Sequence, residues 1–237
     1  MNRIKFNLKR YFKKFPVTAT LLTLNTIMVF VVIFTGSFTT QNLIRWGGLL
    51  PSKIETEQEY YRLLTSMFLH GGIIHFLANS YFLHYLGGFT EKILGSKKYL
   101  FVYFVSGLGS SILVFLLSNS NTVTIGASGA LFGILGSLLT LTFTRKHWFP
   151  PMVINNIRSI TIINLVFTFL IVNISVYGHL GGLITGIVLI YFVTPEKPYY
   201  LNNLYDSSYT SYRNSDIIID YKDIIDDDDN NQNNYLS

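Results

Sequence analysis

Long apolar runs recur along this chain and constrain its fold more than any other feature. Because a helix crosses the hydrocarbon core of a bilayer in about 17–25 residues, runs of this length predict transmembrane helices and not barrel strands. A sixth run is equally long but is interrupted by histidine, asparagine and glycine. The sequence therefore predicts an all-α membrane protein with six transmembrane helices. In chain order the runs are 17–34, 67–89 (the interrupted one), 99–117, 125–143, 157–172 and 176–193.

Composition agrees with a protein that is mostly embedded in lipid. Of the 237 residues, 49% are hydrophobic and only 13% are charged, which is too little charge for the surface of a large soluble domain. Cysteine is absent, which removes disulfides, thiolate metal sites and a cysteine nucleophile together. We expect the lipid bilayer as a partner, and we expect no cofactor, no metal ion and no nucleic acid.

The charges divide the chain into three parts. Residues 1–16 form a basic N-terminus, and 17–194 form the membrane domain, whose motifs lie at about 40–194. Residues 195–237 contain every aspartate of the protein, and such a polar, like-charged tail is expected to be disordered. The first apolar run has no obvious cleavage site after it, so we expect a retained helix and not a signal peptide.

The lysines and arginines predict the orientation in the membrane. Six basic residues precede the first run, and more lie after the second run and between the fourth and fifth, whereas the short loops 118–122 and 173–175 carry no charge. The positive-inside rule then places both termini in the cytoplasm, with a long outer loop between the first two helices. Helices two, four and six would all run inward, so their first turns would lie at one outer level.

Four polar residues occupy that outer level. His75 and Asn79 lie near the start of the second helix, Ser128 near the start of the fourth, and His179 near the start of the sixth. Polar side chains within membrane helices are functional candidates by default. The pattern predicts one site built from three helices, open to the extracytoplasmic side.

Elimination narrows the chemistry of a hydrolase at this site. The His-Glu-x-x-His pattern of a zinc peptidase is absent, the apolar runs contain no aspartate, and no lysine or arginine lies between Tyr99 and Thr144. Ser128 as nucleophile with His179 as general base remains. Without an aspartate to serve as the usual third member, we predict a catalytic dyad and not a triad.

Two further features of the runs support such a site, and each has a structural alternative. His75 and Asn79 are four residues apart and share a helix face, from which they and the backbone N–H of Ser128 would face an oxyanion. Interhelical hydrogen bonding is the alternative for this pair. Glycines in the fourth and sixth runs let the helices approach closely, which would bring Ser128 and His179 together, and plain helix packing is the alternative. These glycines are Gly129, Gly133 and Gly136 in the fourth run and Gly182 and Gly186 in the sixth.

In these residues the chain resembles the rhomboid family of intramembrane serine proteases, over roughly 40–194. Tyr61-Arg62 stands where the family has Trp-Arg, and Glu91 follows at the end of the second helix. Phe132 stands where some members have a tyrosine under the catalytic imidazole. The matching motifs are Gly126-Ala127-Ser128-Gly129, His179-x-x-Gly182-x-x-x-Gly186 and His75-x-x-x-Asn79.

The resemblance implies a six-helix fold and a role for each of these residues. Ser128 would be the nucleophile, His179 the base, and His75, Asn79 and the Ser128 amide the oxyanion donors. Gly126, the helix glycines, Phe132, Arg62 and Glu91 would support the site. The implied activity is cleavage of single-span membrane proteins near the extracytoplasmic face, through an acyl-enzyme.

Two other classes of protein share part of this pattern. A proteolytically silent rhomboid-like protein that binds and escorts membrane helices would keep the glycines but would not need Ser128 or His179. A small-solute transporter would show charge within the membrane or inverted repeats, and the sequence shows neither. The natural substrate and the oligomeric state are left open by the sequence.

Overall fold

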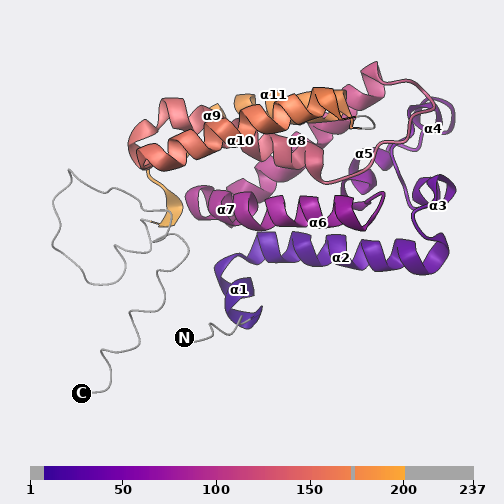
Figure 1. The fold of residues 1–237 in the computed structure, drawn as a ribbon, viewed down its shortest axis with the longest axis horizontal. Helices are drawn as coiled ribbons and strands as arrows, with labels where there is room; N and C mark the ends of the chain where they lie inside the picture. Colours follow the sequence, from indigo (N-terminus) through magenta and orange to yellow (C-terminus); the bar gives the residue numbers. More distant parts are fainter. Residues whose placement is uncertain (1–7, 172–173, 201–237) are drawn as a thin grey trace.

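The computed structural model describes residues 8–171 and 174–200, and within these ranges the chain is helical, without a β-strand. The long helices lie side by side along one direction, and the short helices α3 to α5 gather at one end of the bundle (Figure 1). Their bounds are α1 (Leu8–Lys14), α2 (Pro16–Gly36), α3 (Thr40–Arg45), α4 (Pro51–Glu57), α5 (Arg62–Thr65), η1 (Ser66–Phe68), α6 (Ile73–Phe82), η2 (Leu83–Gly87), α7 (Gly88–Leu94), α8 (Ser96–Leu117), α9 (Ser128–Thr144), η3 (Lys146–Trp148), α10 (Pro151–Leu170) and α11 (Val176–Val193).

Four of the described helices, α2, α8, α10 and α11, are long and apolar enough to cross a membrane. The apolar helix α9 has 17 residues and is shorter than these. The interrupted run forms α6, a π-helical turn η2 and α7, which follow one another without a break from Ile73 to Leu94. Phe34, Ile74 and Phe192 are each more than 80% exposed, an outward apolar surface that suits lipid and not water.

Helix α9 packs against both α8 and α11, which also pack on each other, and glycines allow this close approach. A Cβ atom on Gly182 would overlap the carbonyl oxygen of Gly129, and one on Gly186 would overlap that of Gly133. The Ser137 hydroxyl also donates to the carbonyl of Gly186 at 3.0 Å, across the same interface. The two backbones therefore touch directly, with no side chain between them.

The carboxylate of Glu91, in the middle of the short helix α7, joins three helices at the opposite end of the bundle from α3–α5. It accepts hydrogen bonds from the backbone N–H groups of Val17 and Thr18, both at 2.9 Å, and so caps the start of α2. The hydroxyls of Thr18 and Ser96 donate to it at 2.8 and 2.7 Å. A negative charge with four donors at a helix N-terminus is stabilising even though Glu91 is buried.

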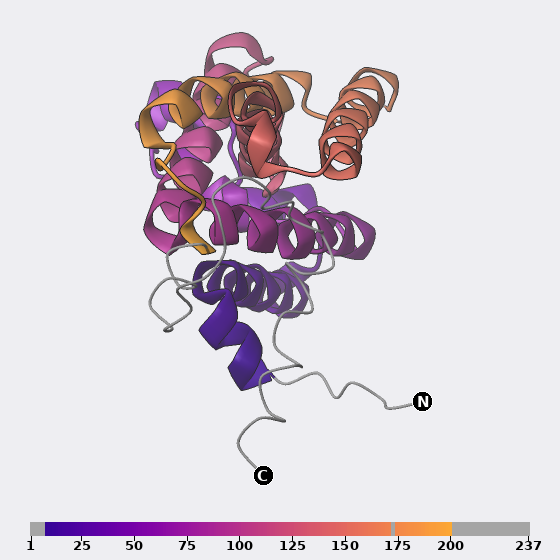
Figure 2. The same cartoon turned by 90° about the vertical axis from the view of Figure 1, so that its left-hand side faces the viewer.

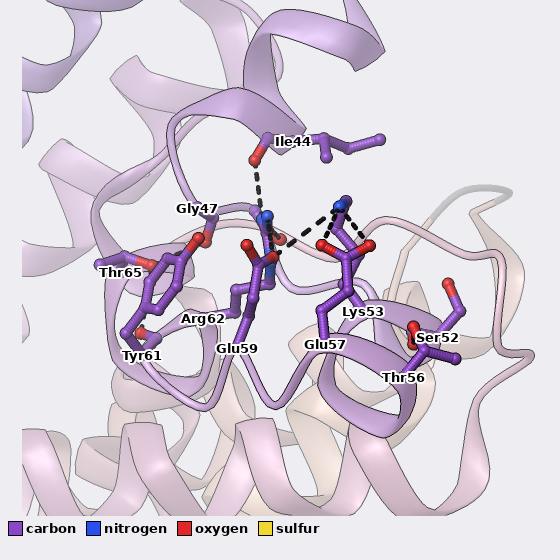
Figure 3. A network of polar contacts seen from close by, with 11 residues as sticks. Ile44, Gly47, Ser52, Lys53, Thr56, Glu57, Glu59, Tyr61, Arg62 and Thr65 are labelled. Atoms are coloured by element: carbon purple, nitrogen blue, oxygen red, sulfur yellow. Dashed lines mark hydrogen bonds and ion pairs between the residues drawn. The ribbon is translucent and has the colours of Figure 1, made fainter.

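The segment between α2 and α6 is held by Arg62, which is only 3% exposed. Its Nη1 donates to the carbonyls of Ile44 and Gly48 at 2.7 and 2.8 Å, and its Nε donates to Glu59 at 2.6 Å (Figure 3). The hydrogen bond from Arg62 lowers the pKa of the Glu59 carboxyl below its ordinary value. One guanidinium thus ties α5 to the chain that follows α3.

The same segment braces the residues that lead into α9. Leu49 and Thr124 exchange two backbone hydrogen bonds, at 3.0 and 2.9 Å, as an isolated antiparallel bridge. The N–H of Gly126 donates to the carbonyl of Ser66 at 2.9 Å. Because Gly126 lies two residues before the start of α9, this bracing places the first turn of that helix.

Helix α10 stands to one side of the other long helices when the bundle is viewed end-on (Figure 2). It packs on α9 and α11. Thr168 near its end is 1% exposed, while Phe167 and Phe169 beside it are at least half exposed. One face of α10 is therefore turned into the bundle, next to the start of α11.

Candidate active site

Three helices contribute polar residues from their first turns to one cavity of about 730 Å³. Ser128 is the first residue of α9, His75 the third of α6 and His179 the fourth of α11. Asn79 follows one turn after His75 and lines the same cavity. The four polar residues singled out in the sequence therefore do meet in space, and mostly apolar side chains surround them.

Gly126 shapes the approach to Ser128. Its φ angle of +124° lies where residues with a side chain are rarely found. A Cβ atom at this position would lie 2.9 Å from Nε2 of His75 and 3.6 Å from Oγ of Ser128. The missing side chain thus leaves open the space between the hydroxyl and the imidazole, where a substrate carbonyl would have to sit.

Two contacts hold the imidazole of His179. The ring of Phe132 stacks on its face, with the ring centroids 3.9 Å apart and the planes inclined by 17°. The hydroxyl oxygen of Thr168, on α10, lies 2.8 Å from its Nδ1. With one contact on the face and one on the edge, the ring has little freedom, and Nε2 is the nitrogen left for the cavity.

His75 and Asn79 are held in different ways. Nδ1 of His75 accepts from the N–H of Gly71 at 3.4 Å, which leaves the ring proton on Nε2, the atom that faces Gly126. The side-chain amide of Asn79 donates one proton to the carbonyl of His75 at 2.9 Å. Its second N–H has no partner among the described residues, so both side chains retain a donor for a ligand.

The hydroxyl of Ser128 and the imidazole of His179 share the cavity but make no hydrogen bond to each other across the described parts of the chain. A long separation of this pair is common in proteins without bound substrate, because such bonds tighten in the substrate complex. The two groups therefore lie in one site, and we expect them to form their hydrogen bond only when a substrate is bound.

Of the other residues singled out from the sequence, Phe132 also lines this cavity, and the remaining ones do not. Arg62 and Glu91 fasten the fold at its two ends, as described above, and the helix glycines set the spacing of α9 and α11. His70 is buried with its ring edge against His75, at 5.2 Å between centroids. His84 bonds through Nδ1 to the hydroxyl of Tyr11 at 2.7 Å and stacks on its ring.

Sequence reasoning missed the contribution of α10. Asn164 lines the cavity and Thr168 contacts His179, yet neither was singled out. A signal was available, because the two residues are four apart and share a helix face, as His75 and Asn79 do. Thr168 was hard to notice since threonine is frequent in the apolar runs of this chain.

Gly126 gives a direct test of the space between Ser128 and His75. Gly126→Ala is expected to lower kcat for any reaction at this site by about 100-fold, because the methyl group occupies the place of the reacting carbonyl. The strained φ should also lower the free energy of unfolding by about 1–3 kcal/mol. Turnover and thermal unfolding of purified protein measure the two effects.

The matched control is Gly72→Ala. Gly72 is close in sequence to His75, its backbone is extended, and nothing lies within 4 Å of a Cβ atom there. This variant should keep its turnover and stability. Equal losses in both variants would show that the loop, and not the space beside Ser128, limits the reaction.

The fold and the cavity together define a class: helical membrane proteins with a polar, serine- and histidine-containing site near one end of the bundle. The family model that describes the Rhomboid domain matches residues 57–196. This chain therefore belongs to the rhomboid family, and it is a multi-pass membrane protein.

Several named relatives are similar to this chain. The chain is 39% identical to Rhomboid protease GluP of Bacillus subtilis (strain 168) over 70% of its length, which is 32% of that relative. It is 36% identical to RHOMBOID-like protein 4 of Arabidopsis thaliana over 65% of its length and 39% of the relative. It is 27% identical to Putative rhomboid protease YdcA of Bacillus subtilis (strain 168), over 81% of its length and 95% of the relative.

The chain thus spans about a third of the length of the first two relatives.

Proposed function

We propose that this protein is an intramembrane serine endopeptidase that cleaves the transmembrane helix of single-span membrane proteins near the extracytoplasmic face. The observation that carries the proposal is the single cavity that contains Ser128, His179, His75 and Asn79. The names of the relatives, two of which contain the words rhomboid protease, support the same reaction.

The reaction begins at the hydroxyl of Ser128. Its Oγ attacks the carbonyl carbon of the scissile peptide bond, while Nε2 of His179 takes the hydroxyl proton. The tetrahedral intermediate collapses, the C–N bond breaks, and the imidazolium returns the proton to the leaving amine. Water, activated by the same imidazole, then hydrolyses the ester at Ser128 and restores the enzyme.

The oxyanion of the intermediate needs donors that are in place beforehand. Nε2–H of His75, the second amide proton of Asn79 and the backbone N–H of Ser128 serve this purpose, since the first turn of a helix leaves its N–H groups unbonded. Gly126 keeps the space between these donors open. Each donor is worth about 10²–10³ in rate in other acyl-transfer enzymes.

The topology completes the proposal. With α6 to α7 and α9 counted as spans beside the four long helices, the chain crosses the membrane six times, with a long outer loop containing α3 to α5. The basic N-terminus and the loops with Arg145 and Lys146 place both termini in the cytoplasm. The site then opens toward the extracytoplasmic side.

The substrate follows from where the cavity lies. A helix hides its peptide carbonyls in hydrogen bonds, so a substrate must unwind before Ser128 reaches one. Glycine, proline or asparagine in the substrate should help, and small residues before the cleaved bond suit a cavity bounded by Phe82, Leu131 and Leu135. Cleavage that is insensitive to added helix-forming residues would count against this.

A proteolytically silent protein that escorts membrane helices is the alternative function. It would use the same cavity to bind a helix, and it would not need the stacked, edge-bonded His179 or the open space at Gly126. Because a ring contact and a hydrogen bond both fix the imidazole of His179, we favour a histidine that takes part in a reaction.

The test is reconstitution of the full chain in liposomes with a single-span reporter protein. We expect two fragments, with the cut mapped by mass spectrometry to the outer third of the reporter helix. A fluorophosphonate should stop the reaction and label the peptide that contains Ser128. Reporter that remains intact but co-purifies with unlabelled protein would instead support the escort function.

A further inference from the structure

We propose that Thr168 is the positioning residue of His179: it selects the ring tautomer that can act as a base, and it takes the place of an acidic third member, which the described residues lining the site do not include. The inference rests on the proposed function and deepens it. It amends the prediction that histidine works without a third group.

The hydrogen bonds of Thr168 determine which nitrogen of His179 carries the proton. A hydroxyl has one proton to donate, and Thr168 gives it to the backbone carbonyl of Asn164 at 2.8 Å. The contact between its oxygen and Nδ1 of His179, also 2.8 Å, must then run the other way. Nδ1–H therefore donates to Thr168, and Nε2 is left unprotonated.

This tautomer is the one that the reaction requires. Nε2 must accept the proton of Ser128, so a proton already on Nε2 would block the first step. The carbonyl of Asn164 cannot rotate away, because it belongs to the regular backbone of α10. The orientation of Thr168 is thus set by the helix itself, and the hydroxyl presents a lone pair to the ring.

The site also stabilises the charged ring that forms during catalysis. When His179 becomes an imidazolium, its Nδ1–H already points at the oxygen of Thr168, so the hydrogen bond strengthens without any rearrangement. Phe132 holds the ring face at the same time. The described residues that line the cavity include no aspartate or glutamate that could take this place.

The hydrogen bond between Thr168 and His179 also links two helices, since Thr168 belongs to α10 and His179 to α11. The base is aligned only while the last turns of α10 lie against the start of α11. A hydroxyl is a weaker partner than a carboxylate, so its removal should cost less than the loss of an aspartate in a triad.

The experiment compares Thr168→Val with Thr168→Ser in the reconstituted full chain. Valine keeps the shape and removes the oxygen, and it should lower kcat about tenfold with KM within twofold. Serine restores the hydroxyl and should recover at least half of kcat. The matched control is Thr161→Val, since Thr161 is equally buried on α10 and bonds its own helix carbonyl, at 2.7 Å, without contacting the site.

A second measurement keeps the proposal testable if the valine variant folds poorly. Nitrogen-15 NMR of histidine-labelled wild type, with His179 assigned by difference from His179→Ala, should show the proton on Nδ1. Thr168→Val should show a mixture of tautomers.

An unchanged kcat in Thr168→Val would overturn the inference, and so would an Nε2 proton on His179 in the wild type. A serine variant as slow as the valine one would do so too, by pointing to packing. Full activity in Thr168→Val together with an inactive Ser128→Ala would refute the role of Thr168 but not the proposed protease function. Cleavage by Ser128→Ala would refute both proposals.

Discussion

Replacement of Ser128 by alanine is expected to lower kcat/KM for a single-span reporter by at least about a thousandfold. Without the hydroxyl there is no atom to form the acyl-enzyme, and the remaining oxyanion donors act only on the slow attack of water. His179→Ala should cost a similar factor, because a neutral serine hydroxyl is a poor nucleophile without its base.

The two losses should not add. Ser128 and His179 act as a unit, so the double variant should be no slower than the slower single variant. Fragment formation is measured at early times in liposomes with equal amounts of folded protein. Ser118→Ala is the control, because Ser118 is a second serine that lines the cavity and should be dispensable. Activity above a tenth of wild type in Ser128→Ala would refute the assignment of the nucleophile.

The second large effect concerns the interface between α9 and α11. Gly186→Ala is expected to lower the free energy of unfolding by about 3 kcal/mol, because its Cβ atom would overlap the carbonyl oxygen of Gly133 and backbone cannot move aside as a side chain can. Alanine favours a helix over glycine by only about 1 kcal/mol, so packing decides the sign. Thermal unfolding in detergent, followed by circular dichroism, measures it.

Gly88→Ala is the matched control on a helix of the same bundle. The nearest atom to a Cβ at Gly88 is a ring carbon of Phe15 at 3.5 Å, which is an ordinary contact. This variant should be as stable as wild type, or more stable by up to about 1 kcal/mol. A tolerant Gly186→Ala would mean that α9 and α11 can separate without cost.

Much of the architecture followed from helix periodicity and length. The apolar runs at 17–34, 99–117 and 176–193 correspond closely to α2, α8 and α11, since a membrane helix satisfies its own backbone and needs no partner to be recognised. The interrupted run was less regular: the helix begins only at Ile73, because the preceding Leu69–Gly72 segment is extended or bent.

The part of the candidate site that could be predicted from the sequence consists of polar residues within apolar runs. Ser128, His179 and His75 line one cavity in the structure, and their shared level was deduced from the parity of the helices. Thr168 was not predicted as a site residue, because a threonine hydroxyl can donate to a carbonyl of its own helix and then needs no partner on another helix. Only the three-dimensional neighbour, Nδ1 of His179, distinguishes it from Thr161.

The short helices α3 to α5 could not be predicted from the sequence, because contacts between distant residues stabilise them. Their stability comes from the buried Arg62 and its bonds to the carbonyls of Ile44 and Gly48, which lie 18 and 14 residues away. Contacts of this kind follow no period, so a pattern in the sequence cannot reveal them.

The bridge between Leu49 and Thr124 has a consequence for the order in which the molecule matures. It joins residues 75 apart in the sequence, and the hydrogen bond between Gly126 and Ser66 joins residues 60 apart. Closing such long loops comes late in folding, since their entropy is paid before the contacts form. A newly inserted chain would therefore hold its long helices while Ser128 is still misplaced, and the proposed activity would appear only after the segment between α2 and α6 has docked.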